Sequence, residues 1–414
     1  MSRILGACMV AMALVASACS LSPHPIRVGA VYPLSGSQGP GGVDEYRGVR
    51  LAVDLVNEDG GVDGRVIDLE PVDVSGADAA PGAVATLSRR GIRFVLGSYG
   101  SSISAPASAE AARRRMLFWE TGAVGSMPGP GGGRFFFRVA PSGGVLGRAA
   151  VSFVAERLAP VLGRPATSLR FAVANVGDLY GATVAEGAVQ EIRSLGLPFA
   201  GQFSYPAQRP DLAGVVARIA RSKPDVLFVS AYLEDSVALR RELVRQHVSL
   251  VAGIGTSSSF CMPAFGQALG RDAVGLFASD KPDGDALRPS GLTLPARRLL
   301  ERARAAYRDS YHEAMSASAL AGFSAAWALF HDVMPHAGAI TPQAVSSAAL
   351  RIRIASGGLP NGSGLEFVPA GGADAGANLR AASVIWEWMG VNRRAVVWPP
   401  QFATAPITPM SLAP

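Results

Sequence analysis

Short runs of β-branched or aromatic residues alternate with longer amphipathic stretches along most of this chain. The stretches between runs carry apolar residues at helical spacing, as Val49, Val53 and Val56 do. Such alternation is typical of βα units, whose right-handed crossovers place helices on both faces of a parallel sheet. We therefore predict an α/β fold with strands near 26–32, 66–72, 92–96, 116–119, 135–139, 169–174, 199–203, 225–230 and 250–254.

The strand series breaks once, at Pro141-Ser142-Gly143-Gly144, and then begins again. A chain of 414 residues is long for one core and suits two domains. We predict two doubly wound parallel-sheet lobes, with helices at 295–312 and 317–334 returning to the first. The stretches 364–368 and 383–389 are expected to form a hairpin on the second lobe. The predicted boundaries are 26–141 and 280–356 for lobe 1, 142–279 and 357–400 for lobe 2, and 401–414 for a tail.

The N-terminus has the pattern of an export signal. Arg3 precedes an apolar run over 4–15, and Ala16-Ser17-Ala18 stand directly before Cys19. The run is too short for a stop-transfer helix, so 1–18 is expected to be removed. The small residues resemble a bacterial lipobox, which implies that Cys19 is lipidated, that 19–25 is a tether and that the chain is held on the outer face of the cytoplasmic membrane. The alternative is an ordinary cleaved signal beside a coincidental cysteine.

Cysteine usage excludes an internal disulfide in the mature chain. Cys8 leaves with the signal and lipidation consumes the thiol of Cys19, which leaves Cys261 alone. A single cysteine without a nearby histidine is expected to be a small buried apolar residue rather than a nucleophile.

Charge and motif patterns exclude several function classes. The net charge is +6, but the arginines are scattered in clusters no larger than Arg113-Arg114-Arg115, which favours a solvated surface over nucleic-acid binding. Both lysines, Lys223 and Lys281, precede proline, so no ATP-binding P-loop is present. The histidines lack metal-ligand spacing and no GxSxG elbow occurs, so we expect no metal, no cofactor and no catalytic residues. We therefore do not expect an enzyme.

Three segments carry a family resemblance. They are the opening run 26–36, Ile-Arg-Val-Gly-Ala-Val-Tyr-Pro-Leu-Ser-Gly, with Tyr46-Arg47-Gly48; the stretch 57–64, Asn-Glu-Asp-Gly-Gly-Val-Asp-Gly; and the run 95–102, Val-Leu-Gly-Ser-Tyr-Gly-Ser-Ser, followed by Pro106. They are similar to the leucine/isoleucine/valine-binding proteins of ABC importers. The resemblance implies a type I periplasmic-binding fold that closes like a clamp, with three hinge crossings near 140–144, 278–282 and 356–360. It also implies permease and ATPase partners and a monomer.

The expected ligand site lies where loops at the carboxyl ends of the strands meet. Ser101 and Ser102 precede an Ala-rich helix whose N-terminus favours an anion, so a ligand carboxylate is the natural occupant. The alternative is that these serines only cap the helix. The resemblance adds six more candidate ligand-binding residues: Tyr99, Glu120, Thr121, Ala123, Tyr180 and Tyr232.

Two departures from the family pattern leave the ligand open. Gly41 replaces an early-loop aromatic, and Gly255 stands where amino-acid binders place an acid for the α-amino group. Glu120 or Glu234 could substitute for that acid. Otherwise the ligand is an amine-free acid, for which Tyr99, Trp119, Tyr180, Tyr232 and Phe260 would offer flat apolar surfaces.

The sequence thus predicts an exported solute-binding lipoprotein of an ABC importer. Its ligand is expected to be an amino acid or a related small carboxylate. Two alternatives remain: a ligand-sensing receptor with the same fold, and an importer component for an amine-free aromatic or amide ligand.

Overall fold

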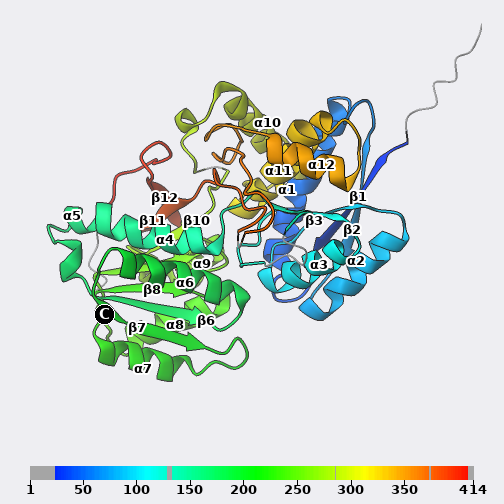
Figure 1. Cartoon of the computed structure of the whole chain (residues 1–414). Helices are drawn as coiled ribbons and strands as arrows, with labels where there is room; N and C mark the ends of the chain where they lie inside the picture. Colours follow the sequence, from blue (N-terminus) through cyan, green and yellow to red (C-terminus); the bar gives the residue numbers. More distant parts are fainter. Residues whose placement is uncertain (1–23, 128–132, 285, 373, 409–414) are drawn as a thin grey trace, which may run out of the picture.

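The computed structural model describes residues 24–127, 133–284, 286–372 and 374–408 as two α/β lobes lying side by side (Figure 1). The predicted signal 1–18, Cys19 and the start of the tether lie outside the described residues. The first lobe has a five-stranded parallel sheet in the order β2-β1-β3-β4-β5. Its strands are β1 Ile26–Tyr32, β2 Ile67–Asp73, β3 Phe94–Gly97, β4 Leu117–Glu120 and β5 Phe136–Arg138.

Helices cover both faces of the first sheet. Successive strand residues point to opposite sides, so each face presents apolar side chains for the helices to bury. Ala30 belongs to the large core cluster shared with α1 and α11, whereas Val31 belongs to a second cluster with α2 and α3. Helices α1 and α11 approach closely at Gly48, where an added Cβ would lie 1.9 Å from the carbonyl oxygen of Ala319. The helices of this lobe are α1 Gly39–Glu58, α2 Ala80–Arg89, α3 Ser101–Arg113, α10 Leu294–Tyr311, α11 Ala317–Trp327 and α12 Pro342–Arg351.

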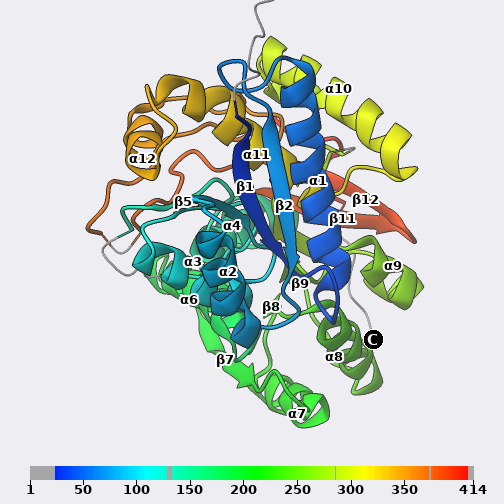
Figure 2. The same cartoon turned by 90° about the vertical axis from the view of Figure 1, so that its right-hand side faces the viewer.

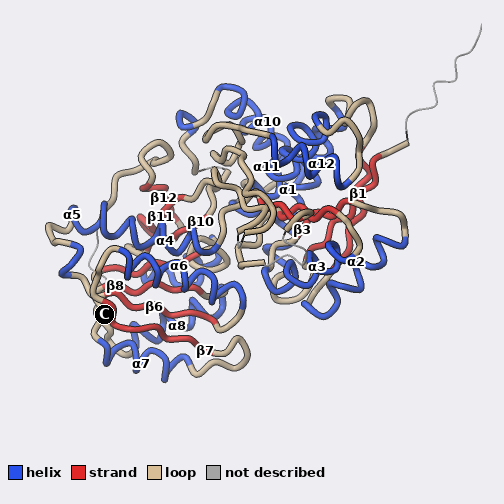
Figure 3. The backbone as a smooth tube through the Cα atoms, in the orientation of Figure 1, coloured by secondary structure: helices blue, strands red, loops and turns tan. Residues whose placement is uncertain are grey.

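The second lobe has a seven-stranded sheet in the order β12-β11-β10-β9-β8-β6-β7. Five strands run parallel, and β11 and β12 add an antiparallel hairpin at one edge (Figure 3). The strands are β6 Phe171–Val176, β7 Phe199–Tyr205, β8 Val226–Ser230, β9 Ala252–Thr256, β10 Phe277–Asp280, β11 Val384–Gly390 and β12 Arg393–Trp398. The helices are α4 Gly143–Phe153, α5 Ala159–Val161, α6 Leu179–Ser194, α7 Leu212–Ser222, α8 Leu233–Arg245 and α9 Pro263–Leu269.

The predicted α/β class with two lobes is confirmed, but the predicted late hairpin is wrong. The segment 364–368 forms only isolated bridges, Ile354 with Leu365 and Phe367 with Asn378, while β11 pairs with β12 instead. The Phe367 ring packs edge-on against Trp119 and Phe137 of the first lobe, with centroids 5.3 and 5.0 Å apart. The chain therefore stays with the first lobe beyond 356–360, where the third crossing was predicted. The Gly- and Pro-rich run 357–364 therefore forms a turn within the first lobe and not a crossing between the lobes.

The predicted tail is not free over its described part. Phe402 is buried beside Gly291 and Gly362, and the backbone N–H of Thr408 donates to the Glu387 carboxylate at 3.0 Å. Figure 2 shows the hairpin that carries this segment close to α9 at one side of the molecule. Residues 401–408 thus pack against the hairpin through Thr408 and against the segments around 291 and 362 through the buried ring of Phe402.

Candidate functional site

The turn from β3 into α3 brings two predicted site residues to the edge of the first lobe. Helix α3 begins at Ser101 itself, one turn earlier than the Ala-rich run suggested, and neither serine makes a side-chain capping bond. The interpretation of these serines as mere caps is therefore wrong. Ser101 is buried and its Oγ accepts from the N–H of Gly125 at 2.9 Å, whereas Ser102 is half-buried and its Oγ accepts from Gln38 Nε2 at 3.4 Å. The first N–H groups of α3 remain available to an anion, because a helix start lacks intrahelical acceptors.

The end of β4 and the loop after it hold three predicted site residues, Glu120, Thr121 and Ala123, but their side chains are buried in the interior of the first lobe. The Glu120 carboxylate accepts from Ser104 and from the N–H groups of Gly122 and Ala123, at 3.0 and 2.8 Å. Burial raises the Glu120 pKa to about 7. This carboxylate braces the loop.

Thr121 is equally occupied. Its hydroxyl donates to Glu45 Oε1 at 2.7 Å and lies 2.6 Å from the Tyr32 hydroxyl. The Glu45 carboxyl is fully buried, which raises its pKa to about 8. A buried polar cluster thus lies directly under the loop.

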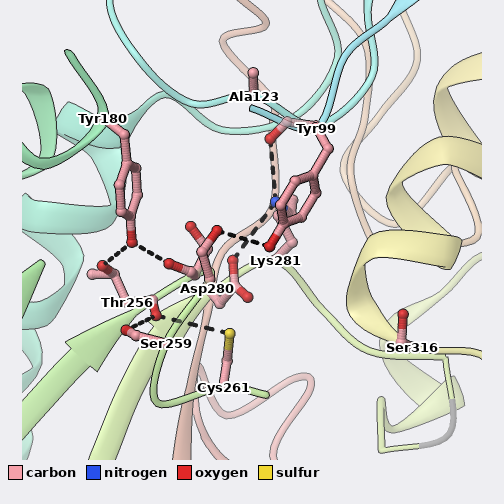
Figure 4. A network of polar contacts seen from close by, with 12 residues as sticks. Tyr99, Ala123, Tyr180, Thr256, Ser259, Cys261, Asp280, Lys281 and Ser316 are labelled. Carbon is pink, nitrogen blue, oxygen red and sulfur yellow. Dashed lines mark hydrogen bonds and ion pairs between the residues drawn. The ribbon is translucent and has the colours of Figure 1, made fainter. Parts of the chain in front are cut away.

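The second lobe presents two tyrosines toward this region. Tyr180 is in the first turn of α6, whose N-cap Asp178 accepts from the N–H of Gly181. The Tyr180 hydroxyl lies 2.8 Å from Thr256 Oγ1 and also donates to the Ser257 carbonyl (Figure 4). Tyr232 precedes α8, its hydroxyl donates to Asp178 Oδ2 at 2.7 Å, and its ring centroid lies 5.3 Å from that of Tyr180. Both rings are fixed by hydrogen bonds at their polar ends.

The two lobes meet around a divided cleft. An inner chamber of only about 10 Å³ lies between them, and an outer cavity of about 280 Å³ opens beyond it. The Tyr99 hydroxyl donates to Ser258 Oγ at 2.9 Å across the cleft, and Tyr99, Tyr232 and Ser258 line both spaces. The lobes are therefore in contact, and a solute reaches the inner chamber only when they separate. The inner chamber is lined by Tyr99, Gly100, Ser101, Gly122, Val124, Tyr180, Tyr232, Ser257, Ser258 and Lys281.

Four of the eight predicted ligand-binding residues line the inner chamber: Tyr99, Ser101, Tyr180 and Tyr232. The other four do not line it; they are Ser102, Glu120, Thr121 and Ala123. Glu234 lines the outer cavity, where it is exposed. The prediction that Trp119 offers a surface to the ligand is wrong, since Trp119 is fully buried in the core and its Nε1 donates to the Ala325 carbonyl.

The two glycine departures have a common structural reason, which is that a neighbouring ring fills the space of the missing side chain. A Cβ on Gly41 would lie 2.3 Å from the Tyr99 ring, and a Cβ on Gly255 would lie 2.1 Å from the ring of Phe260. Phe260 is accordingly buried over Gly255 rather than exposed to the cleft. No acid can occupy position 255 without displacing that ring.

Sequence reasoning missed one charged residue of the chamber, Lys281. The residue is 4% exposed and its ammonium donates to the Gly122 carbonyl at 3.2 Å, so it bridges the second lobe's last parallel strand to the first lobe's loop. Two signals were available: it is one of only two lysines, and it lies in the predicted crossing 278–282.

The described part of the chain offers little support for a metal site, a reactive cysteine or a membrane-spanning helix. Over those residues, no group of three His, Cys, Asp or Glu side chains is placed to hold a metal ion. Cys261 is buried, as predicted, and burial raises its pKa. Within the same ranges no helix has the length and apolar character needed to cross a bilayer.

Comparison with known proteins identifies the family. The model of a family described as periplasmic binding protein matches residues 25–370. The chain belongs to the periplasmic binding protein family. Members act outside the cytoplasm, so the chain is an extracytoplasmic solute-binding protein, as its sequence predicted.

This binding protein is similar in sequence or in fold to known proteins over most of its length. It is 26% identical over 408 residues to a Leu/Ile/Val-binding protein homolog of Brucella suis, covering 98% of both chains. A leucine binding protein from Thermotoga maritima has the same fold, with a TM-score of 0.74 at 15% identity over 90% of this chain and 97% of that one. A branched-chain amino acid transporter substrate binding protein from Streptococcus pneumoniae, solved with isoleucine, gives 0.69 at 19% identity over 91% and 100%.

Proposed function

We propose that this protein binds a small carboxylate-bearing solute between its lobes and delivers it to the permease of an ABC importer, without chemical turnover. Family membership supports the binding role. The solved transporter component from Streptococcus pneumoniae holds isoleucine, and another from Desulfitobacterium hafniense holds leucine, which supports an amino acid or a close analogue as the class of solute.

One observation carries the proposal. Ser101 opens α3 in the first lobe and faces the same chamber as Tyr180 and Tyr232 of the second. A carboxylate placed there would accept from the N-terminal N–H groups of α3 and from a serine hydroxyl, while the tyrosine rings cover the organic body. The helix dipole favours the negative charge at that end.

The proposed mechanism is closure of a hinged clamp. The solute first meets the α3 end of the open first lobe, and the second lobe then swings in with its tyrosines. Contacts from both lobes form only in the closed state, so the ligand shifts the equilibrium toward that state. The permease would recognise the closed arrangement, in which the two lobes form one continuous surface.

Calorimetry tests the binding role with amino acids, aromatic acids and short aliphatic acids as probes. Ser101→Ala is expected to weaken binding of the best probe by about tenfold or more, because a hydrogen bond to a charged group is lost. Ser194→Ala is the matched control, since Ser194 is exposed at the far end of α6. If no carboxylate probe binds, or if both variants behave alike, the site assignment fails.

We further propose that Cys19 carries a lipid anchor and that the protein works as a monomer. Cys19→Ala should move the protein from the membrane fraction to the soluble fraction, because the acyl chains supply the membrane affinity. Unchanged membrane association of that variant would contradict the anchor.

A further inference from the structure

A lysine buried in the cleft is the least expected feature of this binding protein. The sequence contains two lysines, and Lys223 is exposed at the end of α7. Lys281, by contrast, is 4% exposed and follows β10 directly, where the chain leaves the second lobe. Figure 4 shows its side chain between Asp280 and the loop that carries Ala123, close to Tyr99.

The ammonium of Lys281 has unused hydrogen-bonding capacity. It carries three N–H donors. Over the residues that the structure describes, the Gly122 carbonyl at 3.2 Å is its one acceptor within hydrogen-bonding distance. Asp280 Oδ1 lies 3.9 Å away, which is an ion pair but too long for a hydrogen bond. A buried ammonium with unfilled donors is costly, so the site favours an additional acceptor from a bound molecule.

A bound anion would lie between two electropositive groups, the Lys281 ammonium and the N-terminus of α3. Lys281 and Ser101 line the same inner chamber, as do Tyr180 and Tyr232. A carboxylate there would take hydrogen bonds from the first turn of α3 and a charge-assisted bond from the ammonium. The buried lysine is independent of the helix end, and both point to the same anionic occupant.

The acids near the chamber do not line it. Asp280 Oδ1 has no hydrogen-bond partner among the described residues, but it lies 3.9 Å from the Lys281 ammonium, whose charge opposes its own, and the Glu120 carboxylate accepts from Ser104 and from the loop N–H groups. Glu45 lies beneath the loop, and burial raises its pKa to about 8 against the opposing effect of the Lys281 charge. Position 255, a glycine covered by Phe260, supplies no acid either.

We infer that Lys281 selects the solute, which is an organic carboxylate without an α-amino group. The protein supplies the cation of the cleft itself, and a ligand ammonium brought beside it would meet like charge in a site that excludes water. The inference rests on the proposed binding function and narrows its substrate class from amino acids and analogues to amine-free acids.

Matched pairs of probes test the inference by calorimetry: leucine with isocaproate, and phenylalanine with hydrocinnamate. The wild-type protein is expected to bind an amine-free acid at least about tenfold more tightly than its amino acid. Lys281→Met should weaken that acid by about 10- to 100-fold and abolish the preference, whereas Lys281→Arg should retain the preference. Lys223→Met, the other lysine, should match the wild type.

The outcomes separate this inference from the function on which it rests. Tighter wild-type binding of an amino acid than of its amine-free partner would overturn the role of Lys281 and leave the binding function intact. So would unchanged acid binding by a folded Lys281→Met variant. If Lys281→Met does not fold, as judged by circular dichroism, the inference is still tested by the preference of the wild type and of Lys281→Arg for the amine-free acid over its amino acid. Failure of every probe to bind the wild type would contradict the binding function itself.

Discussion

Replacing Tyr99 by Phe removes a hydrogen bond that joins the lobes across the cleft. The Tyr99 hydroxyl donates to Ser258 Oγ at 2.9 Å, and the two residues belong to different lobes. In an open form water would hydrate both hydroxyls, so the change acts on the closed form alone. The net value of such a bond is about 0.5–1.5 kcal/mol.

Ser258 is half-buried, so water can partly replace the lost hydroxyl. We therefore expect the lower half of that range, about 0.5–1 kcal/mol, which is a two- to fivefold shift from closed to open. Ligand affinity should fall by no more than the same factor, because the closed form is only made less accessible.

Distances between spin labels measure the equilibrium directly. Asp68→Cys and Ser194→Cys place one label on an exposed position of each lobe, away from the cleft. Tyr99→Phe, Ser258→Ala and the double variant form a cycle that isolates the pair. Tyr32→Phe is the control, since its hydroxyl partner Thr121 lies in the same lobe. A coupling below about 0.3 kcal/mol would refute the reasoning.

Three further predictions concern stability. The Glu45 pKa of about 8 lies above its ordinary value of 4.5, so the folded state holds the proton more firmly and stability should fall as pH rises from about 4.5 toward 8. Melting temperatures across this range should fall less for Glu45→Gln than for the wild type or for the exposed control Glu313→Gln; parallel curves would contradict this. Gly48→Ala should cost about 1–3 kcal/mol in urea unfolding by forcing α1 and α11 apart, while Gly39→Ala, with no atom nearer than 3.7 Å, should cost less than 1. Phe367→Ala should cost about 3–5 kcal/mol by the same measurement, and a loss under 1 kcal/mol would argue against its packing in the first lobe.

Strand positions in both lobes could be predicted because parallel strands buried on both faces appear as short apolar runs. The run 26–32 was predicted to the residue, and β8 within one. The late segment 364–368 could not be assigned correctly. It has strand-like composition, but its position is fixed by distant partners, such as the Asn378 amide that donates to the Val139 carbonyl at 3.1 Å. No local pattern reveals such a contact.

The site was predictable where a residue's role follows from its place in a turn. Tyr99 and Ser101 lie at the end of β3 and the start of α3, so any fold of this class brings them to the cleft. The orientation of Glu120 was not predictable, because it depends on Ser104 and on the N–H groups of its own loop. Lys281 escaped notice because its burial arises from contact with the other lobe.

The first lobe is assembled from two widely separated parts of the chain, and this has a consequence for the order of folding. Helix α1 packs against α11 at Gly48 and Ala319, so its apolar face has no partner until about 270 further residues have emerged. The second lobe's five parallel strands, β6 to β10, are contiguous and can pair earlier. We expect the second lobe to nucleate folding and the first to stay open to chaperones and proteases until its later half arrives. Pulse proteolysis during refolding would show this order as earlier protection of 171–280 than of 26–138.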